Sequence, residues 1–374
     1  EIKALPHSGR QLVDEAEHAV VGAGVLLVAQ IGLEIAAKGA ALRALHVPLA
    51  DAVSHPCFQV EAFAVGVEIV VQAVVQLVLV HAQKLVTRAK AQRFCFAAGF
   101  HPCDLHCHST MSDGSTPVDN VVEYAIQAGL NFISLTDHDT MAGVERAVNL
   151  GKRKGIRVIP GMEITTLDHE RGRLAHLLCY MPRKTEKLEK LTAATLKERN
   201  SAIVPVVEEV AKHYPITLAD VKKAAGDSTC IYRQHIIRAL MDRGYTYAVF
   251  SDLYDIFKTI PYIMEYPDTR DVADMIKNAG GVACLAHPGH YDSIDLAWEL
   301  AKDGKIQAIE LSHPRNSESD REEIEKIIKQ YWLVPTGGSD YHGFYSSVPH
   351  PLGTCTMPEE ALGALIEVRN ELNK

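Results

Sequence analysis

In residues 104–374, short apolar runs alternate with stretches in which apolar residues recur at helical spacing. Each run is short enough for a buried strand and leads into a polar end. The runs are NFISLTDHD (131–139), IRVIPGMEIT (156–165), RLAHLLCYM (173–181), GGVACLAHPG (280–289), IQAIELSHP (306–314) and WLVPTGGSDYHG (332–343). Helical stretches precede the last three runs, and a helix over 117–128, ended by Gly129, precedes the first. Strands that alternate with helices predict parallel β/α units.

This alternation stops between Lys184 and Tyr266. The stretch KLEKLTAATLKERNSAIVPVVEEVAKHY has the pattern of a long amphipathic helix, and ITLADVKKAAG and RQHIIRALMDRGY continue as shorter helices without intervening strands. We therefore expect a small helical subdomain at 184–266, inserted into a barrel whose two parts are 101–183 and 267–374. Insertions of this kind commonly cover a site as a lid or substrate-binding subdomain.

Residues 1–100 differ in composition from the rest of the chain. They contain no Asn, Met, Tyr or Trp and a single Thr, and their eight basic and eight acidic residues cancel. The apolar run 62–80 has nearly the length of a membrane span, but Glu68, Gln72 and Gln76 interrupt it and no basic cluster flanks it. We interpret this run as buried helix and not as a membrane anchor. The Ala/Val-rich segment has no assignable role, and a non-native origin stays open.

Composition and charge limit the classes of function. With 374 residues, the chain can hold two or three domains or one large barrel with additions. The net charge of −9 argues against bulk binding of nucleic acid or of an anionic membrane, so an anionic substrate needs a local positive centre. The eight cysteines are scattered without a CxxC pair, which favours a reducing cytoplasm over a disulfide framework. Nothing in the pattern indicates an obligate protein partner.

Ionisable side chains gather at the polar ends of the strands. In DLHCHSTMSDGSTP (104–117), two histidines lie two residues apart, so a strand would point both imidazoles to one face. The strand-end set is His106, His108, Asp113, His138, Glu163, His176, His287, Asp340 and His342. In a β/α barrel, active sites form where the strands end. Imidazole with carboxylate predicts two to three divalent ions, with Mn favoured and Zn, Fe or Mg as alternatives.

The ordered motifs DLHCHSTMSDGS, LTDHD, GMEIT, AHPG and GSDYH resemble those of the polymerase and histidinol phosphatase (PHP) superfamily. The resemblance extends from Asp104 to about the end of the chain. It implies a distorted seven-stranded β/α barrel that holds up to three divalent ions. The ligand sets that it implies are His106, His108, Glu163 and Asp340 for the first ion, Glu163, His176 and His287 for the second, and Asp113, His138 and His342 for the third.

The helical insertion resembles one branch of this superfamily, the RNase AM-like phosphoesterases that act on nucleoside 3′,5′-bisphosphates and on 5′ ends of short RNA. This resemblance implies that Arg233 in YRQHI binds a substrate phosphate, with Lys258 as a looser match. Relatives often carry Arg after AHPG, where this chain has His290, so His290 is the third expected substrate-binding residue. A solvated surface charge remains the alternative for Arg233 and Lys258.

The implied function is hydrolysis of phosphate esters of nucleotides, in which a metal-activated water attacks phosphorus. Glu163, as the bridging ligand, and His138 or His342, as proton donors to the leaving alkoxide, are the expected catalytic residues. Two alternatives stay open. One is a histidinol-phosphate phosphatase, and the other is a non-catalytic PHP module with a structural or interaction role, which the complete ligand set disfavours.

Overall fold

The strands of the barrel lie side by side in the order in which the chain forms them. The computed structural model describes residues 102–246, 257, 260, 262, 264–346 and 348–373. Its strands are β1 (Cys103–Cys107), β2 (Phe132–Leu135), β3 (Arg157–Asp168), β4 (Arg173–Tyr180), β5 (Val282–Leu285), β6 (Ala308–Ser312) and β7 (Val334–Gly337). They form one seven-stranded sheet in the order β1-β2-β3-β4-β5-β6-β7, and a bridge between Cys107 and Tyr341 brings its two edges together. The sheet is therefore a nearly closed barrel, which confirms the predicted α/β fold class.

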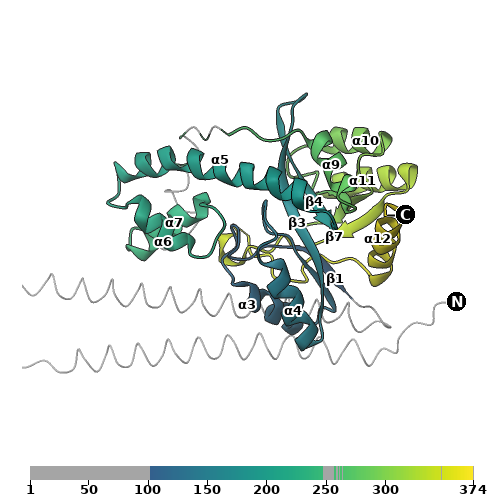
Figure 1. Ribbon diagram of the computed structural model, residues 1–374, viewed down its shortest axis with the longest axis horizontal. Helices are drawn as coiled ribbons and strands as arrows, with labels where there is room; N and C mark the ends of the chain where they lie inside the picture. Colours follow the sequence, from purple (N-terminus) through teal and green to yellow (C-terminus); the bar gives the residue numbers. More distant parts are fainter. Residues whose placement is uncertain are drawn as a thin grey trace, which may run out of the picture. The chain divides into compact units, whose positions relative to one another are not determined.

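One strand of the sheet runs against the others. β4 is antiparallel to both β3 and β5, whereas every other pair in the sheet is parallel. The expectation of parallel units is therefore wrong for β4. The physical reason is the connection, because the turn at 169–172 is too short for the crossover that a parallel pair needs. The resulting hairpin makes β3 and β4 the long central strands of Figure 1.

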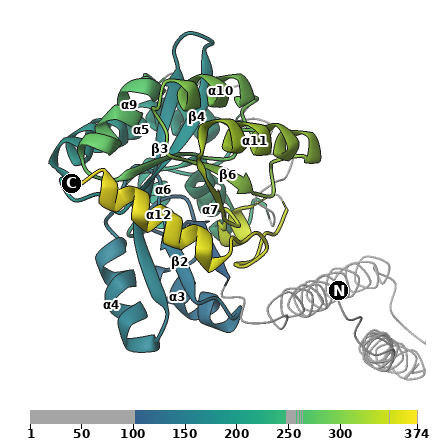
Figure 2. The same ribbon diagram turned by 90° about the vertical axis from the view of Figure 1, so that its right-hand side faces the viewer.

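Helices surround the barrel on its outer side (Figures 1 and 2). They are α3 (Val118–Gln127), α4 (Val144–Lys154), α9 (Thr269–Asn278), α10 (Ile294–Lys302), α11 (Glu318–Tyr331) and α12 (Glu359–Glu371). Their apolar stripes face the strands, as in α3, where Val118, Val121 and Val122 are buried. Gly129 follows α3 with φ of 76°, a left-handed conformation that glycine adopts without strain. The helix thus ends at the glycine that the sequence indicated.

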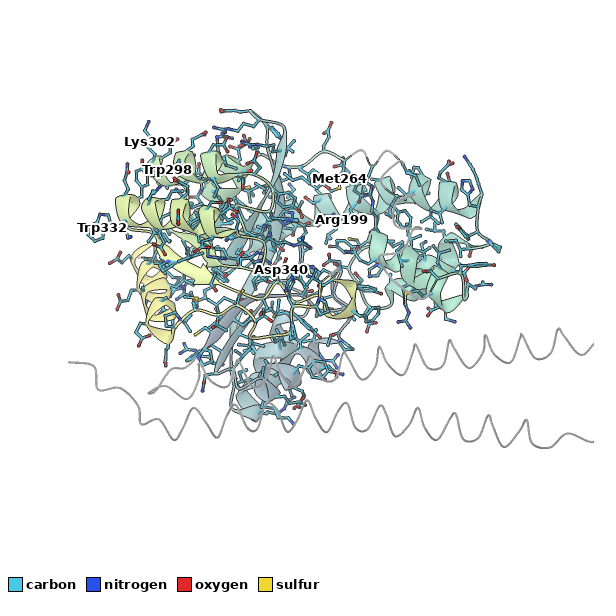
Figure 3. All side chains as sticks on the ribbon, turned by 180° about the vertical axis from the view of Figure 1, so that it is seen from behind. Arg199, Met264, Trp298, Lys302, Trp332 and Asp340 are labelled. Carbon is cyan, nitrogen blue, oxygen red and sulfur yellow. The ribbon has the colours of Figure 1, made fainter. Side chains whose placement is uncertain are left out.

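The chain between β4 and α9 contributes helices and, among the described residues, no strand. These helices are α5 (Glu186–Ala211), α6 (Leu218–Ala225) and α7 (Arg233–Asp242). Figure 1 shows α5 extending away from the barrel with α6 and α7 beside it. They share a core of their own that includes Ile203, Val206 and Ile236. The buried ion pair between Arg199 Nη2 and Asp139 Oδ2, 2.8 Å apart, ties α5 to the loop after β2 (Arg199 is labelled in Figure 3).

Two regions for which the sequence raised expectations are not described by the structure. Residues 1–100, including the run 62–80, and the candidate Lys258 lie outside the described residues. Within the part that is described, no helix combines the length and the apolar character that crossing a membrane requires.

Candidate metal centre

All nine side chains predicted as ligands lie together inside one end of the barrel. His106 is in β1 and His108 directly follows it, and the Nε2 atoms of both imidazoles lie 3.1 Å from Glu163 Oε2. This agrees with the rule that residues two apart on a strand share a face. Glu163 lies in β3 and His176 in β4, and the remaining side chains come from loops after β1, β2, β5 and β7. Glu163 and His176 therefore lie within the long strands β3 and β4 and not at their ends, where they had been expected, whereas the other seven lie at or after strand ends. Residues far apart in the sequence thus meet at one end of the barrel.

The two carboxylate oxygens of Glu163 face different imidazoles. Oε1 lies 2.7 Å from His176 Nδ1 and 2.9 Å from His287 Nε2. Oε2 lies on the side of His106 and His108 and is also 3.4 Å from His138 Nδ1. Glu163 is only 1% exposed, so its charge must be balanced inside the protein. This geometry is that of a carboxylate placed between two groups of ligands.

Asp340 joins the Oε2 side of Glu163. Its Oδ1 atom is 3.4 Å from His106 Nε2 and 3.2 Å from His108 Nε2. Asp340 has φ of 50°, a left-handed conformation that is uncommon for a non-glycine residue, and its N–H donates to the His106 carbonyl at 2.9 Å. The preceding Gly338 lies so close to β1 that a Cβ would collide with His106. The glycines of GGSD therefore allow Asp340 to approach the two histidines.

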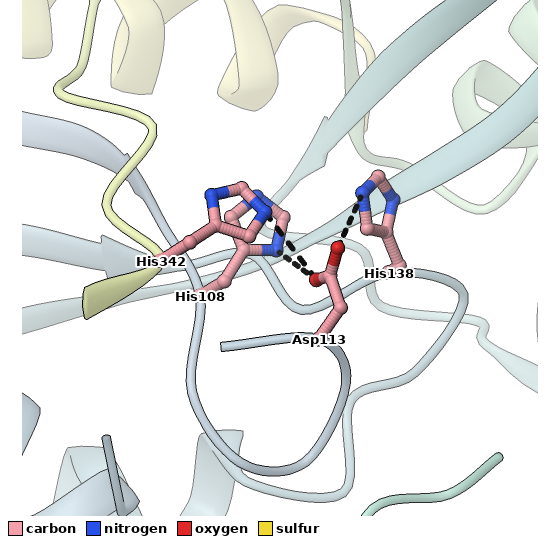
Figure 4. Close-up of side chains that lie close together, drawn as sticks. All are labelled: His108, Asp113, His138 and His342. Carbon is pink, nitrogen blue, oxygen red and sulfur yellow. Dashed lines mark ion pairs between the residues drawn. The ribbon is translucent and has the colours of Figure 1, made fainter. Parts of the chain in front are cut away.

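A third group surrounds Asp113 (Figure 4). Asp113 Oδ1 is 3.3 Å from His342 Nε2 and 3.7 Å from His108 Nδ1, and Oδ2 is 3.9 Å from His138 Nε2. His108 was expected only in the first group, yet its Nε2 atom faces Glu163 and Asp340 and its Nδ1 atom faces Asp113. His138 also faces both Asp113 and Glu163. The groups are therefore contiguous, and imidazoles lie between them.

The donor set fits divalent cations on physical grounds. Several buried ring nitrogens have no hydrogen-bond partner within the described part of the chain, among them His106 Nε2, both nitrogens of His108 and His138 Nδ1. They lie close to carboxylate oxygens without the alignment of hydrogen bonds, as expected of atoms arranged around an ion. Burial lowers the pKa of His138 to about 3, so this imidazole is neutral and can act as a ligand at pH 7.

Burial also opposes the charged form of Glu163, but the neighbouring His138, His106 and His176 outweigh it and hold the pKa of Glu163 well below its usual value. The carboxyl group is thus ionised at neutral pH. An ionised carboxylate surrounded by imidazole nitrogens is the donor chemistry that Mn, Zn and Fe prefer.

Two further buried residues of this centre were not collected from the sequence. Glu310 in β6 is fully buried, lies 3.1 Å from His106 Nδ1 through Oε1, and accepts the His287 N–H through Oε2 at 2.8 Å. His313 follows β6, accepts the Arg315 N–H through Nδ1 at 3.0 Å, and places Nε2 3.5 Å from Asp340 Oδ2. The available signal was a charged residue inside the apolar run IQAIELSHP, which is costly unless it is paired.

Buried aspartates hold the loops that carry the ligands. Asp137 accepts hydrogen bonds from Ser109 N–H at 2.8 Å and from the hydroxyls of Ser109 and Ser112, which shapes the loop that ends at Asp113. Asp104 accepts from the N–H and hydroxyl of Ser339, next to Asp340. Each carboxylate is satisfied by several donors, so these loops are fixed by contacts within the chain and the ligand positions are preorganised.

A cavity of about 320 Å³ opens onto the ligand groups. Arg315, His290 and His350 line it together with the ligands, and no carboxylate pairs with Arg315 in the described part of the chain. Burial lowers the pKa of His290 to about 4, so it is a neutral hydrogen-bonding group at pH 7. Arg233 is not among the residues that line this cavity, and its guanidinium lies 5.0 Å from the centre of the Tyr262 ring. The next residue, Gln234, does line it and donates to Asp113 Oδ2 at 3.3 Å.

Comparisons with known proteins agree with this geometry. The family model of the PHP domain matches residues 104–331. The phosphoribosyl 1,2-cyclic phosphate 1,2-diphosphodiesterase of Eggerthella lenta is 37% identical over 66% of this chain and 96% of its own length. The 5′-3′ exoribonuclease of Haemophilus influenzae is 30% identical over 64% of this chain and 89% of its own length. The 3′,5′-nucleoside bisphosphate phosphatase of Chromobacterium violaceum is 27% identical, with coverage of 64% and 86%.

A solved structure shows the same fold. A protein of Bifidobacterium adolescentis, described as a metal-dependent phosphoesterase, superimposes with a TM-score of 0.65 and is 29% identical to this chain. The match covers 71% of this chain and 96% of the other. The resemblance inferred from the motifs is thereby confirmed.

Proposed function

The chain belongs to the PHP domain family, and we propose that it hydrolyses phosphate esters of phosphorylated ribose compounds, with nucleoside 3′,5′-bisphosphates and 5′ ends of short RNA as the leading candidates. The protein is a metal-dependent phosphoesterase, and its relatives include a cyclic phosphodiesterase, an exoribonuclease and a bisphosphate phosphatase. The names of the first and third of these relatives specify a ribose unit that bears phosphate at two places. A second phosphate on the ribose is therefore the substrate feature that we propose for this chain.

The observation that carries the proposal is that the two oxygens of Glu163 face different imidazoles. We assign the first ion to His106, His108, Glu163 and Asp340, the second to Glu163, His176 and His287, and the third to Asp113, His138 and His342. When bound, divalent ions at these positions lower the pKa of a water molecule and neutralise charge on the phosphoryl oxygens. Mn is the favoured metal, with Zn, Fe and Mg as alternatives.

The chain's own residues hold and orient the reacting groups. Hydrolysis adds water to phosphorus and breaks one P–O ester bond, and the released oxygen of the sugar takes a proton. His342 lines the cavity beside Asp113. Burial opposes its charged form, but Asp113 outweighs burial and raises the pKa of His342, so this imidazole can supply that proton if it is not engaged as a ligand. His138 lies there too, but it is neutral at pH 7, so its role as proton donor stays a prediction. Glu310 fixes the ring of His106 through Nδ1, which leaves Nε2 to face Glu163.

The second phosphate needs a positive group away from Glu163. Arg315 supports this role, because it lines the same cavity and has no carboxylate partner in the described residues. His290 lines the cavity too, as a neutral donor, so its predicted role in substrate binding remains part of the proposal. The predicted roles of Arg233 and Lys258 stay predictions, since the first packs on Tyr262 and the second lies outside the described residues.

The alternative substrate, the cellular location and the partner of the site are further parts of the proposal. Histidinol phosphate is the alternative substrate, and it carries only one phosphate. A cytoplasmic location is supported by five cysteines that are free thiols, namely Cys107, Cys179, Cys230, Cys284 and Cys355. A small nucleotide or short RNA is the proposed partner of the site.

A single experiment tests this function. The full-length protein is analysed for bound metal and assayed for release of phosphate or nucleotide from four compounds. These are a nucleoside 3′,5′-bisphosphate, a 5′-phosphorylated dinucleotide, phosphoribosyl 1,2-cyclic phosphate and histidinol phosphate. We expect two to three equivalents of metal and turnover of the compounds with two phosphates, both lost in a chelator.

A matched pair of variants separates the site from the surface. His176→Ala removes a group that faces Glu163, whereas His169→Ala removes an exposed histidine in the neighbouring turn. Only the first should lower metal content and turnover. Full turnover by metal-free protein, or preference for histidinol phosphate, would contradict the proposed function.

A further inference from the structure

A second cavity of about 210 Å³ lies next to the first one. Tyr345 lines both cavities. Neighbouring residues also divide between them, since Asp113 and Gln234 line the first, whereas Gly114 and His235 line the second. Pockets for whole small ligands usually measure about 300–1,000 Å³, so this smaller cavity suits part of a larger ligand that is held elsewhere. The adjacent metal centre provides such an anchor.

An exposed aromatic ring forms one wall of the second cavity. Phe344 is 47% exposed, and its backbone N–H donates to Ser115 Oγ at 2.9 Å, which fixes the position of the residue. Its ring lies 4.5 Å from that of Tyr345, and the Arg238 guanidinium lies 5.8 Å from its centre. A large apolar side chain held in an exposed position beside a binding cavity is suited to stack on a flat ligand.

The rest of the lining is largely polar and includes positively charged side chains. His235 is 2% exposed, and its Nδ1 accepts the Tyr232 N–H at 3.1 Å. The ring proton of the neutral imidazole is therefore on Nε2, which has no hydrogen-bond partner among the described residues and can donate to a ligand. Lys223 and Arg238 also line the cavity, and the one carboxylate there, Asp242, is paired with Arg238 at 2.8 Å. One positive charge is thus left to attract a phosphate.

We propose that this cavity binds the nucleoside that is esterified on the far side of the scissile phosphate, so that the enzyme acts on substrates of two or more nucleotides. This inference rests on the proposed function. The base of this nucleoside stacks on Phe344. In substrates of three or more nucleotides, the phosphate that follows this nucleoside lies near Lys223. A nucleoside 3′,5′-bisphosphate has no group on that side of the scissile phosphorus and does not reach the cavity. The cavity therefore selects an oligonucleotide over a mononucleotide.

The test compares two substrates that differ only in this nucleoside. The full-length protein with Mn²⁺ is assayed on a 5′-phosphorylated dinucleotide and on the corresponding nucleoside 3′,5′-bisphosphate. For Phe344→Ala we expect the ratio of kcat/KM for the dinucleotide to that for the bisphosphate to fall about tenfold, on the scale of one lost base–aromatic stack. Phe344→Trp keeps an aromatic face and should restore the ratio.

The lysine provides a matched control. The dinucleotide has no phosphate beyond the far nucleoside, so Lys223 is tested with a 5′-phosphorylated trinucleotide. Lys223→Ala should lower the ratio of kcat/KM for the trinucleotide to that for the dinucleotide several-fold and weaken its dependence on salt, because it removes one phosphate contact. Lys222→Ala removes an adjacent exposed lysine that does not line the cavity, and should leave the ratio as in the wild type. Equal losses on both substrates, or no change in either, would overturn the proposal.

The outcomes for this site and for the proposed function can be told apart. If the wild type hydrolyses the bisphosphate but not the dinucleotide, the second cavity is not a nucleoside site, and the phosphoesterase assignment stands. If neither is hydrolysed, the proposed substrates are wrong. Whether the second cavity still binds a nucleoside is then measured with a dinucleotide that has an uncleavable methylene-phosphonate linkage. A tenfold loss of affinity in Phe344→Ala would then support the site, and unchanged affinity would reject it.

Discussion

Replacing Glu310 with glutamine should weaken metal binding although Glu310 is not itself assigned as a ligand. The carboxylate is fully buried, and its oxygens lie 3.1 and 3.3 Å from His106 Nδ1. Burial raises the pKa of Glu310, but His313 and His106 outweigh it and hold the pKa below its usual value, so the group is ionised at neutral pH. Glu310→Gln therefore removes a real charge and nearly preserves the shape.

The expected magnitude follows from what this charge does. It keeps the proton of His106 on Nδ1, so that the Nε2 lone pair faces Glu163 and Asp340. The amide of glutamine can present its N–H₂ group to His106 and favour the opposite tautomer. Loss of such a partner typically costs about 10–100-fold in metal affinity, or about 1.4–2.7 kcal/mol. The His287 N–H retains an acceptor in the amide oxygen, so folding should suffer less than metal binding.

The assay is a titration of metal into the stripped protein by calorimetry, with turnover measured in parallel. We expect the dissociation constant of the tightest ion to rise about 10–100-fold, with much of the turnover recovered at saturating metal. Glu325→Gln, which neutralises an exposed glutamate on α11, is the control and should bind metal as the wild type does. An affinity within about twofold of the wild type would refute the role given to Glu310, as this is far below the loss expected for such a partner.

Three further predictions address the ligand bridge, the insertion and substrate recognition. Glu163→Gln removes the carboxylate shared by two ligand groups, so kcat should fall about 10³-fold on every substrate, equivalent to about 4 kcal/mol, and metal analysis should show loss of more than one ion. Arg199→Ala leaves Asp139 buried without its partner, and urea denaturation should show a free energy of unfolding lower by about 3 kcal/mol; a change near zero would mean that α5 is held by other contacts. Arg315→Ala should lower kcat/KM about tenfold or more for substrates with a second phosphate and little for simple monophosphate esters. If Arg233→Ala has that selective effect instead, the original prediction from the motif is correct and the role of Arg315 is not.

Local patterns in the sequence were enough for most of the barrel. The alternation of apolar runs with helical stretches predicted six of the strands, because burial of a strand or of one helix face is recorded in nearby residues. The same reasoning failed for the direction of β4, since direction depends on whether the connecting chain is long enough for a crossover. The pairing of strands depends on contacts between distant segments, which the periodicity of nearby residues does not predict.

The candidate site divides in the same way. That His106 and His108 share a face follows from strand geometry alone, and most of the nine residues could be collected because parallel strands end at one side of a barrel. Glu163 and His176 lie inside β3 and β4, and β4 is antiparallel, so their place in the site depends on the tertiary structure. Which oxygen of Glu163 faces which imidazole depends on strands and loops more than 100 residues apart, as for His287 and Glu163, separated by 124 positions. The roles open to Glu310 and Arg315 likewise depend on which groups surround them. The periodicity of apolar residues predicts which positions are buried. Which groups surround a charged side chain depends on how distant segments pack together.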